Sequence, residues 1–167
     1  MAQVVAGERR PTLELYVAGA GPAYTDRVGS TGAAYLLRTG DAAILLDLGQ
    51  GSFPRVASQV EPADLLGIVI SHPHPDHFID LVPLRHYLRY QCVPPRRVTV
   101  HGPASLGSRL DALHAEPGFA EAALDVVPLS AGFRRIGPFA HRFRQVQAED
   151  LKSTPDLRAE RWVLRLL

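Results

Sequence analysis

Apolar and polar residues alternate along most of the chain in patterns that predict short strands separated by turns and helices. Ile68, Val69 and Ile70 form a β-branched run, which is typical of a strand buried on both faces. Residues 39–41 have the composition of a short hairpin turn between two further strands. The other strands that we expect cover residues 13–18, 33–38, 42–47, 97–101, 124–129, 133–136 and 139–146.

Apolar residues at helical spacing predict a helix from Asp76 to about Tyr90, soon after the buried strand. Asp76 is expected to cap this helix, and Pro83 is expected to kink it, because proline removes a helical hydrogen bond. Further helices are expected at residues 52–60, 104–115 and 119–123. A strand that ends in a loop at the start of a helix is a rigid platform for ligand side chains.

Four side chains that bind metal ions in proteins stand in the loop between this strand and this helix, namely His72, His74, Asp76 and His77. The prolines between them favour extended backbone, on which residues two positions apart share a face, so His72 and His74 can converge. Imidazole and carboxylate donors suit zinc, and also iron or manganese. The spacing allows for two ions, His72 and His74 on one and Asp76 and His77 on the other. The alternative is a loop of histidines without a ligand role.

The composition is that of an ordinary globular protein. A length of 167 residues predicts one domain, and 46% hydrophobic and 21% charged residues are typical values. The net charge of +1 argues neither for nor against a nucleic-acid partner. No apolar run reaches ~18 residues and the N-terminus lacks a signal-peptide core, so we expect a cytoplasmic protein without membrane contact. Cys92 is the single cysteine, which excludes an intrachain disulfide.

Two motifs resemble those of the metallo-β-lactamase superfamily. His72-Pro-His-Pro-Asp-His77 resembles its H-x-H-x-D-H signature, and Leu-Leu-Asp-Leu-Gly at residues 45–49 resembles its first motif, a strand that ends in Asp-x-Gly. The sequences at residues 45–56 and 72–86 are most similar to the ribonuclease Z and arylsulfatase-like branch. The resemblance covers the chain from about residue 13 to about residue 140.

The resemblance implies an α/β (α+β) fold, the N-terminal portion of an αββα sandwich with a mixed sheet and helices on one face. It also implies a site for two metal ions, to which His72, His74, Asp76 and His77 contribute ligands. In the family pattern Asp47 supports the ligand loop by hydrogen bonds without binding an ion. From the residues alone, a simple turn at Asp47 is almost equally good as an explanation.

The downstream part of the chain departs from the superfamily pattern, which continues with a third His, a bridging Asp and a last His. Here His141 is the only His after His114, and it is a weak ligand candidate together with Glu149 and Asp150. We therefore expect residues 1–167 to form one domain that is truncated at its C-terminus, with an atypical tail at residues 145–167. A sheet left uncovered by a missing half favours a homodimer, aggregation or marginal stability.

Two functional hypotheses follow. The first is a metal-dependent hydrolase (an EC 3 enzyme) that cleaves a phosphodiester or ester with a metal-activated hydroxide and is impaired by the absent ligands. Asp76 would orient or deprotonate the water, and the substrate would be an RNA 3′ end or a smaller ester. The second is a truncated, non-catalytic relative that binds metal weakly or acts only as an interaction module. The intact central motif favours the first, and the absent downstream ligands favour the second.

Overall fold

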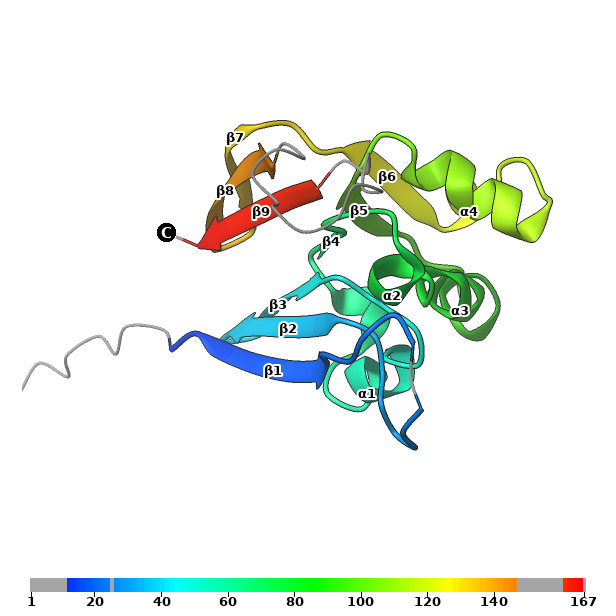
Figure 1. Cartoon of the computed structure of the whole chain (residues 1–167), viewed down its shortest axis with the longest axis horizontal. Coiled ribbons are helices and arrows are strands. Elements are labelled where there is room, and N and C mark those ends of the chain that lie inside the picture. The colour runs from blue at the N-terminus through cyan, green and yellow to red at the C-terminus, as the bar shows by residue number, and fades with distance from the viewer. Residues whose placement is uncertain (1–11, 25, 147–160, 167) are drawn as a thin grey trace, which may run out of the picture.

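The computed structural model describes residues 12–24, 26–146 and 161–166, which form two β-sheets and a layer of helices (Figure 1). Within these residues the larger sheet has the strand order β1-β2-β3-β4-β5-β6, and the smaller sheet has the order β7-β8-β9. The strands are β1 (Glu14–Gly19), β2 (Ala34–Thr39), β3 (Ala42–Leu46), β4 (Ile68–Val69), β5 (Val98–Gly102), β6 (Leu124–Pro128), β7 (Gly132–Ile136), β8 (Phe139–Val146) and β9 (Arg161–Leu166). The helices are α1 (Phe53–Ala57), α2 (Pro75–Phe78), α3 (Leu81–His86) and α4 (Leu106–His114), with 3-10 turns η1 (Pro62–Asp64) and η3 (Ala120–Ala122) and a π-helix η2 (Tyr87–Gln91).

The larger sheet is antiparallel across β1, β2 and β3 and parallel from β3 to β6. The hairpin turn between β2 and β3 contains Gly40 at a φ of 55°, a left-handed conformation that glycine adopts without steric cost. Parallel strands need crossover connections, and α1, α3 and α4 lie in those connections. The C-terminal ends of β3 and β4 therefore lie side by side, and the His-rich loop follows β4.

Successive residues of the inner strands point to opposite faces of the larger sheet, and both faces are buried. One set, which includes Leu45 and Ile68, joins the core that the helices cover. The alternate set packs against the smaller sheet in a second core of Leu37, Ile44, Val69, Ile136 and Phe139. The predicted α/β fold, with a mixed sheet, a second sheet packed on one face and helices on the other, is confirmed.

The prediction of one continuous helix from Asp76 to about Tyr90 is wrong. The segment forms α2, α3 and the π-helix η2, with a first break at residues 79–80. His74 rather than Asp76 precedes the first helical residue, because proline at position 75 favours the first turn of a helix. Pro83 lies in the first turn of the restarted helix α3, where its missing N–H removes no helical hydrogen bond.

The C-terminal strand β9 pairs antiparallel with β8. Residues 147–160 lie outside the described residues, and so do the weak ligand candidates Glu149 and Asp150. In the parts of the chain that the structure describes, no helix has both the length and the apolar character needed to span a membrane.

Strand β1 forms an edge of the larger sheet and presents apolar side chains to solvent. Leu13, Leu15 and Val17 are 51%, 60% and 51% exposed. Leu15 pairs with Leu37, which belongs to the core between the two sheets, so both side chains lie on the same face. The smaller sheet thus covers this face at Leu37 and leaves much of β1 uncovered.

Candidate metal centre

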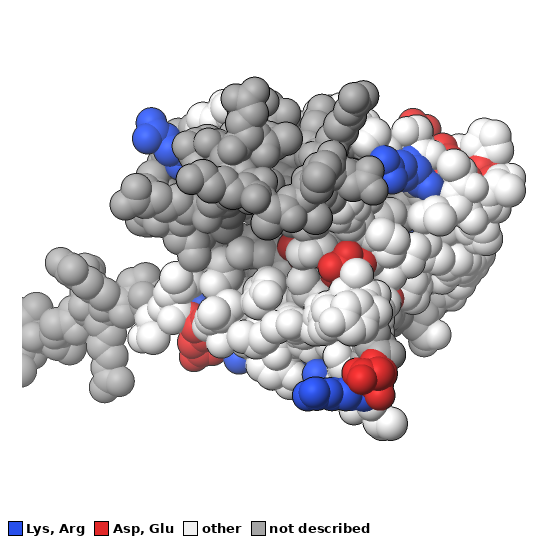
Figure 2. Space-filling view, in the orientation of Figure 1, with Lys and Arg blue, Asp and Glu red and all other residues white. Residues whose placement is uncertain are grey.

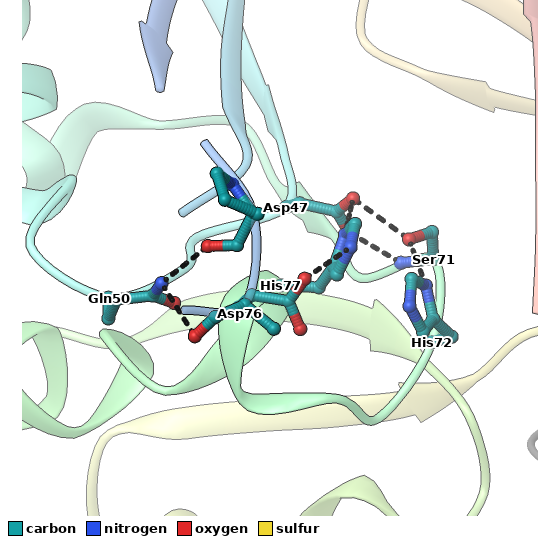
Figure 3. A network of polar contacts seen from close by, with 8 residues as sticks. Asp47, Gln50, Ser71, His72, Asp76 and His77 are labelled. Atoms are coloured by element: carbon teal, nitrogen blue, oxygen red, sulfur yellow. Dashed lines mark hydrogen bonds and ion pairs between the residues drawn. The ribbon is translucent and has the colours of Figure 1, made fainter. Parts of the chain in front are cut away.

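Asp47, at the C-terminal end of β3, is the centre of a hydrogen-bond network that holds the His-rich loop (Figure 3). Its Oδ1 accepts a hydrogen bond from the Ser71 backbone N–H at 2.7 Å. Its Oδ2 accepts from the Ser71 hydroxyl at 2.8 Å and from His77 Nδ1 at 2.7 Å. The carboxylate is buried, so these three bonds replace the water that it loses on folding.

The backbone of Asp47 adopts a φ of 58°, which is unusual for a residue other than glycine. Aspartate is one of the residues that tolerate this left-handed conformation, and strained backbone of this kind concentrates at functional sites. This conformation ends β3 and accompanies the placement of the carboxylate between Ser71 and His77.

Main-chain contacts fix the loop from its other side. The carbonyl oxygen of Asp76 accepts from the Ala33 N–H at 2.8 Å, and that of His77 accepts from the Leu48 N–H at 2.7 Å. Gly49 lies so close that a Cβ atom built on it would stand 1.9 Å from the Asp76 carbonyl oxygen. The Asp-x-Gly motif therefore supplies a carboxylate at one end and room for the His-rich loop at the other.

The donor side chains gather in pairs. The ring centroids of His72 and His74 are 4.8 Å apart, and those of His72 and His77 are 3.8 Å apart. His77 Nε2 lies 3.3 Å from Asp76 Oδ2. Within the described residues, no three His, Cys, Asp or Glu side chains are arranged to hold one ion together.

The chemistry and spacing of the pair of Asp76 and His77 fit a divalent cation. Two donors on one tetrahedral zinc ion, with bonds of about 2.0–2.2 Å, stand about 3.3–3.6 Å apart. The separation of 3.3 Å between His77 Nε2 and Asp76 Oδ2 lies in that range. Because His77 Nδ1 faces Asp47, Nε2 is the ring nitrogen that such a cation would meet.

Two residues of the network were not identified from the sequence. Ser71 lies directly before the first His of the motif and bonds to Asp47, 24 positions away. Asp80 is buried and accepts hydrogen bonds from the backbone N–H groups of Gly51 at 3.0 Å and Phe53 at 2.8 Å, at the start of α1. Burial raises the pKa of Asp80, and these backbone hydrogen bonds oppose the rise. Asp80 thereby ties the segment after the ligand loop to α1.

His86 and His114 lie on the helical side, and the side chain of His141 is outside the described part. His141 lies on β8, where its backbone pairs with Arg134 and Leu166, and its side chain is outside the described part. The rings of His86 and His114 pack against Phe119 on the helical side, with centroid distances of 5.5 Å and 4.0 Å. These two rings contribute to packing around Phe119.

Comparisons with known proteins agree with this architecture. The model of the metallo-beta-lactamase superfamily matches residues 27–146. The metallo-beta-lactamase fold protein YhfI from Bacillus subtilis is 17% identical with a TM-score of 0.74, and the match covers 95% of this chain and 59% of that chain. The short form of human tRNase Z is 18% identical with a TM-score of 0.63, over 92% of this chain and 64% of that one. A diphosphatase of the PhnP family is 15% identical with a TM-score of 0.67, over 93% and 62%. No curated protein sequence matches the chain.

The fold is a sandwich of two sheets with a layer of helices. A His-rich loop follows one of the inner parallel strands, and this arrangement defines the structural class. The chain belongs to the metallo-β-lactamase superfamily, whose model covers most of its length. The chain spans 59–64% of the length of the three structural neighbours above. Their identities are low, so these likenesses establish the fold alone.

Proposed function

We propose that this chain is a metal-dependent hydrolase domain, in which the His-rich loop holds one or two divalent ions, with zinc as the favoured metal. The observation that supports it is the pairing of His77 Nε2 with Asp76 Oδ2 at a distance of 3.3 Å. The Asp47 carboxylate holds the other ring nitrogen of His77, Nδ1. In this proposal His72 and His74 hold one ion, and Asp76 and His77 hold the other. The incomplete donor set described above implies weak binding and impaired turnover.

A divalent ion held by His72 and His74, or by Asp76 and His77, would supply Lewis acidity toward an ester oxygen or a water molecule. The Asp76 carboxylate, whose Oδ2 lies 3.3 Å from His77 Nε2, would orient a water molecule at this part of the loop and accept a proton from it. Asp47 keeps the His77 ring in place through Nδ1. The buried position of Asp47 excludes water from that hydrogen bond and keeps the ring orientation fixed.

The substrate class that we propose is a phosphodiester or a related small ester. The structural neighbours include a tRNase and a diphosphatase, and both names refer to substrates that contain phosphate groups. On the face shown in Figure 2, the described Lys and Arg side chains are scattered instead of forming one basic patch. The sequence also contains no long run of basic residues, which favours a small phosphodiester over a long RNA, because RNA backbones select clustered positive charge.

Metal content and turnover, measured on the same preparation, test the proposal. We expect bound zinc by elemental analysis and slow hydrolysis of bis-p-nitrophenyl phosphate that stops with a chelator and returns with added zinc. Metal near two ions per chain with metal-dependent turnover supports the enzyme. Substoichiometric metal without turnover supports the non-catalytic alternative and refutes the hydrolase.

The second candidate function is an interaction module, for which the exposed apolar side chains of β1 are the specific observation. An open edge strand with apolar side chains is a surface that a second copy of the chain can cover. We expect a dimer in sedimentation experiments and a monomer for Leu15→Lys. The matched control is Leu113→Lys. Leu113 is similarly exposed, at 57%, but it lies on helix α4 and not on strand β1. A wild-type protein that stays monomeric at high concentration excludes self-association through β1.

A further inference from the structure

The Ser71 hydroxyl stands between the Asp47 carboxylate and the His72 ring (Figure 3). It donates to Asp47 Oδ2 at 2.8 Å and lies 2.9 Å from His72 Nδ1. A hydroxyl has one proton, and that proton is directed to the carboxylate, which can only accept. Toward His72 the serine oxygen is therefore the acceptor, and His72 Nδ1 must carry the hydrogen.

His77 contacts the same Asp47 carboxylate directly, without a serine between them. Its Nδ1 lies 2.7 Å from Asp47 Oδ2, so this nitrogen also carries a hydrogen. A neutral imidazole with its hydrogen on Nδ1 has its lone pair on Nε2, the nitrogen that then faces a metal ion. One carboxylate thus sets the tautomer of two rings that the proposed site assigns to separate ions.

We propose that Ser71 is a positioning residue, which relays the Asp47 charge to His72 and thereby fixes Nε2 of His72 as the metal-binding nitrogen. The proposal rests on the hydrolase function proposed above and adds a residue to it. The relay also couples the two halves of the site, because Asp47 Oδ2 accepts from Ser71 and His77 together. A change at the serine hydroxyl should disturb the half that contains His72 and leave His77 in place.

The geometry separates the hydroxyl from the structural role of the serine backbone. The Ser71 N–H donates to Asp47 Oδ1 at 2.7 Å, and every non-proline residue keeps that bond. Ser71→Ala therefore removes the relay, with one of the three donors to Asp47, and keeps the backbone attachment of the loop. Ser71→Thr retains a hydroxyl and is the conservative rescue. Asp47→Asn is the third variant, because it changes the group on which both rings depend.

The first test is made on the metal-free protein by nitrogen NMR of the imidazole rings, at a pH about two units above the ordinary histidine pKa of about 6.5. We expect His72 and His77 to carry hydrogen on Nδ1 in the wild type and in Ser71→Thr. In Ser71→Ala, His72 should shift toward the Nε2–H tautomer while His77 keeps its Nδ1 hydrogen. In Asp47→Asn both rings should change. An unchanged His72 in Ser71→Ala, or an Nε2–H tautomer of His72 in the wild type, overturns the proposal.

The second test is zinc titration by calorimetry on the same variants. Loss of an outer hydrogen-bond partner of a ligating histidine reduces metal affinity about 10–100-fold, and we expect that loss in Ser71→Ala but not in Ser71→Thr. Equal affinities in wild type and Ser71→Ala overturn the metal-positioning role. If the NMR pattern is as expected but the wild type binds no zinc, the relay stands and the hydrolase function fails, so the two failures are distinguishable.

Discussion

A Gly49→Ala variant is expected to lose about 3 kcal/mol or more of folding free energy, since forced overpacking alone costs about 1–3 kcal/mol and a broken hydrogen bond adds to it. The added Cβ atom would lie 1.9 Å from the Asp76 carbonyl oxygen and 2.8 Å from the Ala33 nitrogen. These are backbone atoms that hydrogen-bond to each other, so neither can rotate away. Urea unfolding monitored by circular dichroism measures the loss.

Gly107→Ala is the matched control for this experiment. Gly107 lies inside α4, and the nearest atom to an added Cβ is a Val126 methyl group at 4.0 Å, an ordinary contact. Alanine is the better helix former by about 0.8–1 kcal/mol, so this variant should gain stability. A Gly49→Ala protein with the wild-type unfolding midpoint would show that the ligand loop does not rest against this glycine.

The strands and the donor loop were predictable because their signals are local. A β-branched run such as residues 68–70 identifies a buried strand by composition, although β4 as observed contains only Ile68 and Val69. The four donors follow that strand within a few positions, so one short stretch contains both the platform and the candidate ligands. Their role as metal ligands stays a prediction, whereas their placement around one loop is an observed feature of the fold.

The partners of the loop were less predictable, because they are set by which strand ends meet in the sheet. Asp80 caps α1 from 27 and 29 positions away, and Asp47 bonds to Ser71 across 24 positions. The spacing of apolar and polar residues along the sequence does not predict hydrogen bonds between residues so far apart. The break before Leu81 was missed for a related reason: the apolar spacing continues through residues 79–80, but Asp80 turns to α1 and the helix restarts there.

A His77→Ala variant is expected to bind zinc at least about 100-fold more weakly than the wild type, a loss of about 2.8 kcal/mol in binding free energy. The substitution removes the nitrogen that stands 3.3 Å from Asp76 Oδ2 and also the hydrogen bond from Nδ1 to Asp47. One ion then retains a single carboxylate from this loop, and the buried Asp47 loses one of its three donors. Calorimetric titration with zinc, on protein whose fold is checked by circular dichroism, measures the change.

His114→Ala is the matched control, since it removes an imidazole from α4 that packs on Phe119 and takes no part in the donor loop. Its zinc affinity should equal that of the wild type.

Asp76→Asn tests the contribution of the negative charge. It keeps a side chain of the same shape beside His77 but removes the charge, and we expect a loss of zinc binding of the same order as for His77→Ala. If His77→Ala and Asp76→Asn both bind zinc as the wild type does, the pair of Asp76 and His77 is not a metal site. A loss confined to His114→Ala would instead place the binding on the helical side, because that ring and His86 lie 5.5 Å apart there.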